Sequence, residues 1–364
     1  MECKKTLGQF YTTNYEYILK NMKIPKNVKT ILEPFCGNCD LLKFIENIEL
    51  YDIELYDIDP CKKVVENNSH KINYNVIKRD TLKNPVCYND KFVLTNPPYL
   101  ARNKNSDKSL YDKYKCNDLY KCFILNLIKC DRCLGGIIII PLNFISSIRK
   151  SDIKLRTNFL EIYDIQIINI FEERVFNDTN YSVCCISFTN KYDNHNLQRN
   201  IKKTNIHIYP KNNLLQFTFS SENNYTIGGE LYNIPQNKKY TVKRATKNTT
   251  CKDGFITNIL LKCIDDNINN KLGFYIVEDK NRYIDKTEKL SARSYATLVV
   301  NNKFTLEQQT YLVQKSNNYI NTNREKYNSL FIPNYRESNS IARKRISFDF
   351  AFKIFNYIIS SNFD

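Results

Sequence analysis

The chain has 364 residues and a formal net charge of +16, from 54 Lys and Arg against 38 Asp and Glu. Its length exceeds the usual size of a single domain, so we expect two domains. No apolar run approaches the ~18 to 20 residues that span a bilayer, and the first residues lack the apolar centre of a signal peptide. These features argue against a membrane or secreted protein, and we expect a soluble, intracellular one that is cytoplasmic or bound to DNA.

The chain contains thirteen cysteines, an odd number that indicates reduced thiols rather than a disulfide framework. Two pairs have the CxxC spacing of zinc ligands, Cys36 with Cys39 and Cys130 with Cys133. The pairs lie far apart in the sequence and have no histidine at ligand spacing. We therefore expect core or surface thiols and no metal site.

In chain order, the hydrophobic pattern alternates between helical and extended periods. A helix is expected over 14–22 and a strand over 30–35, followed by a turn at Gly37. Further helices are expected over 40–48, 60–68 and 118–130, and further strands over 53–59, 74–80, 91–99 and 135–142. This alternation is typical of an α/β protein with a doubly wound, mostly parallel sheet of the Rossmann-like kind.

The alternation ends in two strand-like segments, 162–171 and 181–188, which we expect to pair as an antiparallel edge of the sheet. Beyond Thr189 the sequence becomes polar, then irregular and rich in Asn and Lys. We therefore place the domain boundary near residue 195. This gives a first domain over 1–195 and a second, of α+β type, over 196–364.

Polar residues follow several of the predicted strands, at the sheet edge where α/β proteins bind ligands. Glu33 and Gly37 lie between the first strand and the next helix, where backbone can approach a small molecule closely. Asp57 ends the second strand, where an acid can hydrogen-bond the hydroxyls of a ribose, and Asp80 is suited to accept from an exocyclic amine. The glycine turn is neither GxGxxG nor a phosphate-binding loop, so the pattern favours a nucleoside cofactor without phosphate, such as S-adenosylmethionine.

The strand over 91–99 leaves through the sequence TNPPYL. Two adjacent prolines remove two backbone donors and fix φ near −65°, so the segment cannot continue as a central strand. We expect a rigid, extended turn that presents Asn96 and Tyr99.

The ordered set GQFYT (8–12), EPFCGN (33–38), YDIDP (56–60), RDTL (79–82) and NPPY (96–99) resembles the gamma class of DNA adenine-N6 methyltransferases, best the Taq-type enzymes. The resemblance covers about residues 6–190 and implies S-adenosylmethionine as cofactor. NPPY alone also occurs in methyltransferases that act on protein glutamine or RNA. The set differs from the family at Cys39, where glycine is common, which bears on the geometry of the loop.

The resemblance implies a role for each matching position. Residues implied to bind the cofactor are Thr12 and Glu33 at its methionine part, Gly37 in the loop, Asp57 at the ribose, and Ile58, Asp80 and Phe123 at the adenine ring. The implied catalytic residues are Asn96, Pro97, Tyr99 and Phe176, the last stacking on a flipped target base opposite Tyr99. Core packing is the alternative role for Phe123 and Phe176.

Chemistry supports this reading of the Asn-Pro-Pro-Tyr segment. The lone pair of adenine N6 is delocalised into the ring, so the nitrogen is a poor nucleophile. The Asn96 side-chain oxygen and the Pro97 carbonyl can each accept one N6 hydrogen and stabilise the positive charge that develops during transfer. Tyr99 can supply a flat face for a base taken out of the duplex. The reaction needs no general base and no metal ion.

Most of the positive charge lies in the second half, where residues 191–364 hold 27 basic and 15 acidic residues, against 27 and 23 in residues 1–190. Such asymmetry indicates a polyanionic partner, although a solvated lysine-rich surface is the alternative. We expect the second domain to read double-stranded DNA through phosphate and base contacts. The candidate DNA-contacting residues are Lys238, Lys239, Tyr240, Lys243, Arg244, Lys247, Arg343 and Arg345.

The sequence thus predicts a site-specific DNA adenine-N6 methyltransferase, the partner of a restriction endonuclease that acts on the same site. We expect a monomer or weak dimer with no membrane association. Two alternatives remain: a protein-glutamine or RNA adenine methyltransferase, and a catalytically idle DNA-binding relative.

Overall fold

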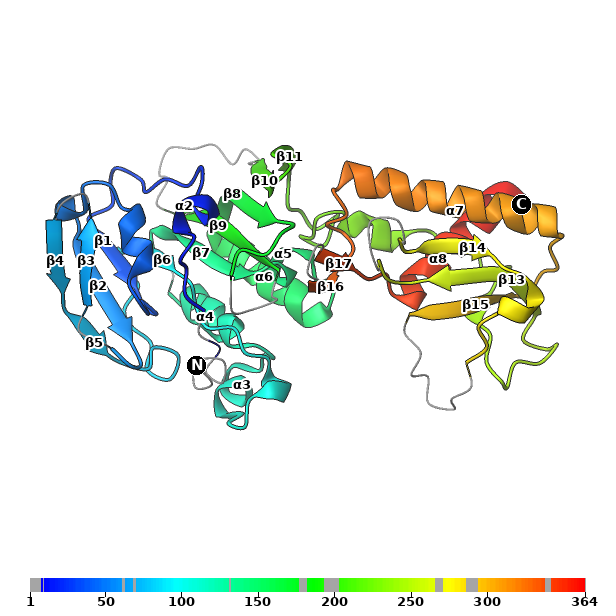
Figure 1. Ribbon diagram of the computed structural model, residues 1–364, viewed down its shortest axis with the longest axis horizontal. Coiled ribbons are helices and arrows are strands. Elements are labelled where there is room, and N and C mark those ends of the chain that lie inside the picture. The colour runs from blue at the N-terminus through cyan, green and yellow to red at the C-terminus, as the bar shows by residue number, and fades with distance from the viewer. Residues whose placement is uncertain are drawn as a thin grey trace. The chain divides into compact units, whose positions relative to one another are not determined.

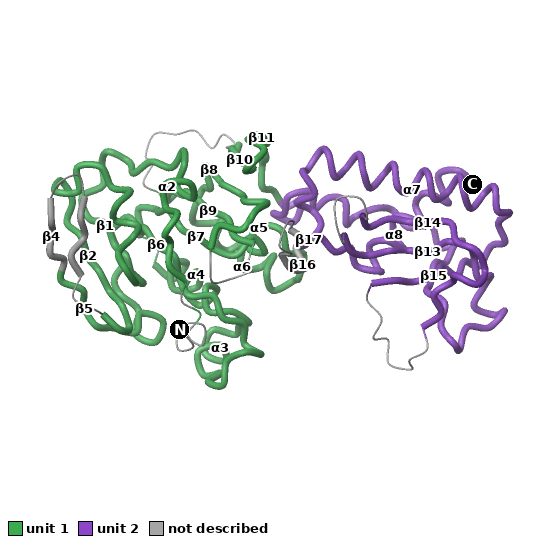
Figure 2. The backbone as a smooth tube through the Cα atoms, in the orientation of Figure 1, with its two compact units in different colours: residues 1–220 green, residues 221–364 purple. Residues whose placement is uncertain are grey.

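The computed structural model describes residues 8, 10–60, 63–67, 70–130, 132–176, 182–192, 203–265, 271–285, 294–337 and 342–363. The chain divides into two compact units, Met1–Ser220 and Ser221–Asp364, coloured separately in Figure 2. Each unit is described by itself below. Among the described residues, no helix combines the length and apolar character needed to cross a bilayer.

In the described part of unit 1, nine strands form one sheet in the order β11-β10-β8-β9-β7-β6-β1-β2-β5 (Figure 1). The strands are β1 (Thr30–Glu33), β2 (Asp52–Asp57), β5 (Val76–Lys78), β6 (Phe92–Thr95), β7 (Gly135–Pro141), β8 (Tyr163–Phe171), β9 (Val183–Asn190), β10 (Thr204–Tyr209) and β11 (Asn213–Phe217). Neighbours from β7 to β5 run parallel, as do β8 and β10, whereas β9 runs antiparallel to both β7 and β8. The prediction of an α/β protein with a large, mostly parallel sheet is confirmed.

The centre of this sheet is built from the segment GGIIIIP of β7, in which every residue is buried. A run of β-branched residues without polar breaks is typical of a strand covered on both faces. Gly136 has no room for a side chain, because a Cβ atom there would lie 2.4 Å from the Val93 carbonyl oxygen of β6. The two glycines that open β7 therefore allow close approach of the neighbouring strands.

Short helices accompany the sheet: α2 (Tyr15–Ile18), α3 (Ser109–Tyr114), α4 (Leu119–Ile128), α5 (Asn143–Ser146) and α6 (Lys150–Ile162). The helix predicted over 118–130 is α4, which is buried on nearly all sides. It packs against α6, and the Lys121 ammonium of α4 forms a buried ion pair with Asp152 of α6. The Ser147 hydroxyl donates to the second oxygen of the same carboxylate at 2.7 Å, so the buried charges are paired.

Two predicted helices of unit 1 are wrong. Within 60–68 the chain forms β3 (Lys63–Asn67), which pairs antiparallel with β4 (His70–Tyr74). Adjacent valines at 64 and 65 favour an extended chain, and the partner strand supplies hydrogen bonds that no local pattern reveals. Within 40–48 the chain forms only two 3₁₀ turns, η1 (Asp40–Phe44) and η2 (Ile48–Leu50). Asn47, with φ of 50°, has left-handed backbone and separates them.

The antiparallel pair predicted over 162–171 and 181–188 exists as β8 and β9, but it does not form the edge of the sheet. Strand β10 pairs in parallel with β8, and β11 pairs with β10. These two strands come after residue 195, so unit 1 extends to Ser220 rather than ending near the expected boundary.

In the residues of unit 2 that the structure describes, a four-stranded antiparallel sheet is combined with two long helices (Figure 1). The strand order is β12 (Val242–Arg244), β15 (Tyr295–Val300), β13 (Phe255–Lys262) and β14 (Gly273–Ile276). Helix α7 (Leu306–Lys326) packs on β13 and β14, and α8 (Phe348–Phe363) packs on α7 and β12. A small hairpin, β16 (Asn334–Glu337) with β17 (Ala342–Lys344), precedes α8.

Sequence features explain the two ends of α7. Thr305 caps its start in a capping box, accepting from the Gln308 amide while the Gln308 side chain accepts from the Thr305 amide. Near the other end, the Arg324 guanidinium makes two hydrogen bonds to Asp265, at 3.1 and 2.8 Å. This ion pair joins the helix to the segment that follows β13.

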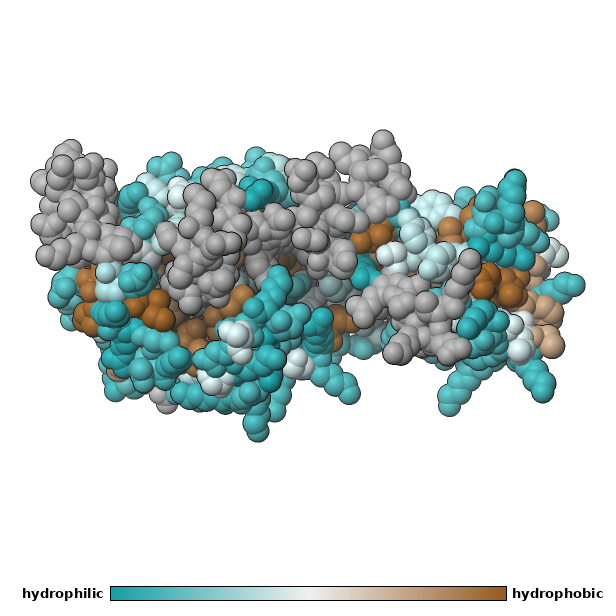
Figure 3. All heavy atoms as spheres, turned by 60° about the horizontal axis from the view of Figure 1, so that its bottom comes forward, coloured by the Kyte–Doolittle hydropathy of each residue, from teal (hydrophilic) through white to brown (hydrophobic). Residues whose placement is uncertain are grey.

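Apolar side chains also reach the surface of unit 2, visible as brown areas among the teal in Figure 3. Phe255, Ile256, Tyr275 and Ile276 on β13 and β14 are 37–49% exposed. Strand β14 is an edge strand, but the Asn317 side chain of α7 donates to the Phe274 carbonyl and accepts from the Phe274 amide. This contact occupies both the amide and the carbonyl of Phe274, so these groups are not open to pairing with a further strand.

Candidate functional site

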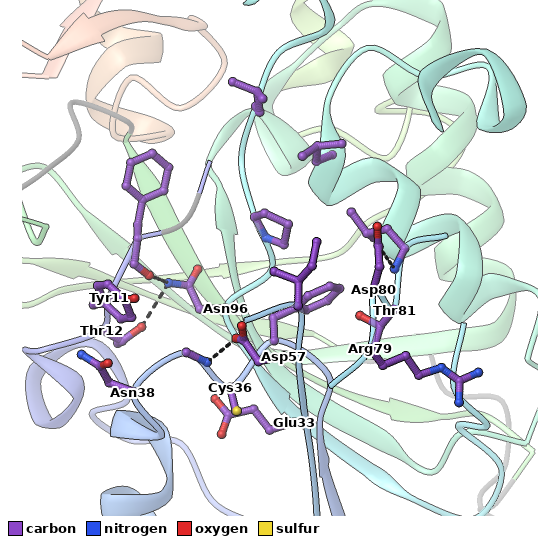
Figure 4. Close-up of a pocket in the computed structure, with 18 of the residues that line it drawn as sticks. Tyr11, Thr12, Glu33, Cys36, Asn38, Asp57, Arg79, Asp80, Thr81 and Asn96 are labelled. Carbon is purple, nitrogen blue, oxygen red and sulfur yellow. Dashed lines mark hydrogen bonds between the residues drawn. The ribbon is translucent and has the colours of Figure 1, made fainter. Parts of the chain in front are cut away.

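A pocket of about 240 Å³ opens in unit 1 at the carboxyl ends of β1, β2, β5 and β6. This is the edge at which doubly wound sheets bind ligands. Seven of the residues expected at the cofactor or the reacting base line it: Thr12, Glu33, Gly37, Asp57, Ile58, Asp80 and Asn96. Figure 4 shows several of these side chains around the cavity.

The loop after β1 forms one wall of the pocket. Gly37 has a left-handed backbone with φ of 48°, and a Cβ atom there would lie 3.1 Å from the Tyr11 ring, which also lines the cavity. Cys39 is left-handed as well, with φ of 59°. This explains why glycine suits that position, since a side chain there carries a conformational cost. Cys36 also lines the pocket, and both cysteines are buried.

Two acids at the strand ends face the pocket with different environments. Glu33 at the end of β1 is 1% exposed. Asp57 at the end of β2 accepts a hydrogen bond from the Gly37 amide at 2.8 Å (Figure 4). It accepts another from the Asp59 amide at 2.8 Å. Backbone donors therefore hold the Asp57 carboxylate in one orientation and join it to the glycine loop.

The far end of the pocket is shaped by the segment after β5. The Asp80 carboxylate accepts from the amides of Leu82 and Lys83, at 3.2 and 3.1 Å, and so caps the turn that follows it. The Thr81 hydroxyl donates to the Pro34 carbonyl at 2.9 Å, which fixes this turn against the loop after β1. Ile58 is 40% exposed although it lines the cavity, so it offers an apolar surface to a ligand.

Asn96 is held by hydrogen bonds to the segment that precedes α2. Its Nδ2 donates to the Phe10 carbonyl at 2.9 Å and to the Thr12 hydroxyl oxygen at 3.1 Å (Figure 4). Its Oδ1 accepts from the Tyr99 hydroxyl. A carbonyl can only accept, so the Phe10 contact determines which end of the amide carries the nitrogen. The Asn96 oxygen is thereby kept as an acceptor.

Tyr99 does not line the pocket, and its ring is 1% exposed. Phe10 stacks on it with ring centroids 5.6 Å apart and 29° between the planes. The Tyr99 hydroxyl also lies 2.5 Å from the Ile139 carbonyl, and burial raises its pKa well above the ordinary value. The face that we expected to receive a base is thus covered by Phe10 in this structure.

Three other expected site residues, Pro97, Phe123 and Phe176, are not among the residues that line the cavity. Pro98 lines the pocket, whereas Pro97 does not. Phe123 is fully buried and meets Phe35 edge-on at 5.6 Å, and it is Phe35 that lines the pocket. Phe176 is also buried, at 2% exposure. The core-packing alternative therefore describes the observed positions of Phe123 and Phe176.

The sequence reasoning missed several pocket residues. Phe35 lines the pocket and stands two residues before Gly37 in the glycine loop. Its position in that loop could have identified it as a pocket residue. Asn105, Asp107 and Leu110 come from the polar stretch after the Asn-Pro-Pro-Tyr segment and line the pocket from another side. Their spacing carries no ligand pattern, so only the fold reveals them.

The candidate DNA-contacting residues of unit 2 fall into two groups. Lys238, Lys239 and Lys247 are exposed. Lys243 is exposed but pairs with Asp253 at 3.4 Å. Tyr240 is 4% exposed and its hydroxyl donates to the Phe363 carbonyl. Arg244 pairs with the buried Asp285 at 3.2 Å and lies over the Phe348 ring.

Tyr240 and Arg244 therefore hold unit 2 together, which corrects their expected place on a DNA-contacting surface. Arg345 is half-buried in the chain after β17, and its amide donates to the Pro333 carbonyl at 3.1 Å. Arg343 lies in β17, and its side chain falls outside the described part of the structure. Among the described residues, no group of three or more His, Cys, Asp or Glu is arranged to hold a metal ion.

Comparison with known proteins finds similarity over part of the chain. Residues 38–176 match the model of a family described as the Eco57I restriction-modification methylases. No curated protein sequence matches the chain. Several solved structures are similar at low identity. One of them is a modification subunit of a putative type I restriction enzyme from Vibrio vulnificus YJ016 (13% identity, 55% of this chain and 47% of that chain, TM-score 0.38). Another is a putative class I S-adenosylmethionine-dependent methyltransferase from Listeria monocytogenes (17% identity, 53% of this chain and 61% of that chain, TM-score 0.36).

The chain spans less than two thirds of the length of either of those structures. The family match covers η1, the strands β2, β5, β6, β7 and β8, and the Asn96–Tyr99 segment between them. Over residues 38–176, the chain is therefore similar to the methylases of restriction-modification systems in the Eco57I family.

Proposed function

We propose that the chain is an S-adenosylmethionine-dependent DNA methyltransferase that methylates N6 of adenine. The observation that carries this proposal is the Asn96 amide, whose nitrogen is anchored on Phe10 and Thr12 and whose oxygen remains an acceptor beside the pocket. A fixed acceptor at that place suits a reaction in which an amine develops positive charge.

The pocket lining fits the proposed cofactor. Glu33 can hold an ammonium group, Asp57 can accept from ribose hydroxyls, and Asp80 can accept from an exocyclic amine. Phe35 and Ile58 add apolar surface for a flat ring. When bound, S-adenosylmethionine supplies an electrophilic methyl group.

The residues of the chain then act on the target amine. The Asn96 oxygen accepts one N6 hydrogen and the Pro97 carbonyl accepts the other, which draws the nitrogen toward tetrahedral geometry. The Tyr99 hydroxyl has the Ile139 carbonyl as a second acceptor, so it can turn away from Asn96 when the amine arrives. For the base to stack on Tyr99, the Phe10 ring must first leave that face.

Unit 2 is proposed to read the double-stranded DNA, because most of the net positive charge lies in the second half of the chain. A restriction endonuclease acting on the same site would be the functional counterpart, as the family match suggests. The exposed lysines at 238, 239 and 247 are the candidates for phosphate contacts.

The decisive experiment is to sequence modified bases in DNA from cells that express the protein, with cells expressing Asn96→Ala as the matched control. We expect N6-methyladenine at one recognition sequence in the first sample only. Unmodified DNA, with radiolabelled methyl transfer to protein or RNA instead, would support the alternative substrates. Transfer to none of the three would indicate an idle relative.

Thr12 is expected to position Asn96, because its hydroxyl oxygen accepts from the amide nitrogen. Thr12→Val keeps the shape but removes this acceptor, and a neutral hydrogen bond of ~1 kcal/mol corresponds to about a fivefold fall in kcat. Thr12→Ser should restore the rate. If the valine variant had the kcat of the wild type, Thr12 would not position Asn96. Cofactor affinity measured in parallel would distinguish a loss of rate from a loss of cofactor binding.

The salt dependence of DNA binding tests the role of unit 2. Each phosphate contact contributes a slope of about −0.9 to log affinity against log salt. Replacing Lys238, Lys239 and Lys247 together by alanine should make the slope shallower. Lys280→Ala is a suitable control, since that lysine of the same unit is exposed and is not one of the candidate DNA-contacting residues. Unchanged slopes in the triple variant would place the phosphate contacts elsewhere.

A further inference from the structure

Two thiols meet at the start of α4, outside the residues that line the pocket. The Sγ atoms of Cys116 and Cys122 lie 3.2 Å apart. Both also contact the Asp118 carbonyl oxygen, Cys116 at 3.5 Å and Cys122 at 3.8 Å. Cys116 is partly exposed, whereas Cys122 is fully buried. One thiol can therefore be reached from solvent and the other lies directly behind it.

The turn between these cysteines is hydrogen-bonded to the segment that follows Tyr99. The Leu100 amide donates to the Asp118 carboxylate at 3.1 Å, and the Leu119 amide donates to the Leu100 carbonyl at 3.3 Å. The Arg102 amide donates to the Asn117 carbonyl at 2.9 Å. Leu100 and Leu119 both line the pocket, so these hydrogen bonds join the turn to the pocket wall.

We propose that Cys116 and Cys122 form a site of reversible oxidation, at which a peroxide converts the two thiols into a disulfide. The Cys116 sulfur attacks one peroxide oxygen, breaks the O–O bond and becomes a sulfenic acid while water leaves. The Cys122 sulfur then attacks the sulfur of the sulfenic acid and forms the S–S bond. The displaced hydroxyl takes up the proton of the Cys122 thiol and leaves as a second water. Two thiols are oxidised to one disulfide and one peroxide is reduced to two waters.

The environment assigns the two roles. The hydrogen bond from the Cys122 thiol is the largest cause that lowers the pKa of Cys116, and a thiolate is the form that attacks peroxide. The same hydrogen bond and burial raise the pKa of Cys122. Cys122 is buried with its sulfur 3.2 Å from that of Cys116, so its place behind Cys116 suits the thiol that reacts second.

The bond would tighten the start of α4. The two sulfurs must close from 3.2 Å to the ~2.05 Å of a disulfide, and the cross-link would enclose the turn over residues 117–121. The backbone bonds of that turn to Leu100 and Arg102 are then held more rigidly. We expect slower amide hydrogen exchange at Leu100, Leu119 and Arg102 in the oxidised protein.

Peptide mapping tests the site in the intact chain. Trypsin cuts after Lys115, Lys121 and Lys129, so the disulfide would join the two separate peptides 116–121 and 122–129. After treatment with hydrogen peroxide and blocking of free thiols, we expect this linked pair in the wild-type protein. Dithiothreitol should release it. The linked pair should be absent from Cys116→Ser and from Cys122→Ala.

Cys87→Ser serves as the matched control, because Cys87 is an exposed cysteine elsewhere in the same unit. That variant should form the 116–122 link as readily as wild type. The proposal fails if, in the wild-type protein, Cys116 and Cys122 can still be alkylated after peroxide has oxidised Cys87. It also fails if Cys116 and Cys122 form disulfides only with other cysteines. None of these readouts uses methyl transfer, so the result stands apart from the proposed enzymatic function.

Discussion

Replacing Asn96 with alanine is expected to slow methyl transfer by about 100-fold or more, an effect of ~3 kcal/mol or greater. The substitution removes one of the two acceptors that act on the target amine, and it also frees the Phe10 carbonyl and the Thr12 hydroxyl from their shared donor. Single-turnover kinetics with saturating cofactor and DNA would measure the loss directly.

A second asparagine provides the control. Asn89 is exposed and lies outside the pocket lining. Asn89→Ala should retain the wild-type rate. If Asn96→Ala turned over near the wild-type rate, the catalytic role of Asn96 would be wrong.

Asp57→Ala should weaken cofactor binding by about 10- to 150-fold, since a hydrogen bond to a charged group contributes roughly 1.5 to 3 kcal/mol. The carboxylate also accepts from the Gly37 amide, so its loss loosens the glycine loop as well. Calorimetry with S-adenosylmethionine would give the change in Kd, and a cooperative melt would show that the variant is folded.

The neighbouring Asp59 is exposed and lies outside the pocket lining, so Asp59→Ala should bind the cofactor like wild type. DNA affinity of the free protein should change little in either variant. Equal cofactor affinity in Asp57→Ala and Asp59→Ala would refute the ribose role.

The helices and strands that could be predicted from the sequence are those whose hydrophobic pattern fits only one type of secondary structure. The uninterrupted run Ile137–Ile140 suits only a strand buried on both faces, and the apolar stretch over 118–130 is long enough to be a helix. The segment 60–68 was ambiguous, because its two valines and mixed charges suit either a helix or a hairpin, and the hairpin depends on β4 as a partner.

Some features of the candidate site could likewise be predicted from the sequence, and others could not. Acids after parallel strands lie at one sheet edge by topology alone, and Glu33, Asp57 and Asp80 indeed share the pocket. Accessibility of the aromatic rings could not be predicted, because it depends on contacts between distant segments. The ring that covers Tyr99 comes from Phe10, and the ring that separates Phe123 from the cavity comes from Phe35.

The pairing of β10 with β8 has a consequence for any attempt to isolate unit 1. A chain shortened to residue 195 would leave the backbone of Ile167–Phe171 without the partner that Asn205–Tyr209 provides. An unpaired strand edge of this kind is a template for pairing with another molecule. Such a fragment would therefore aggregate through β8, whereas one that continues to Ser220 would keep this edge covered by β10 and β11.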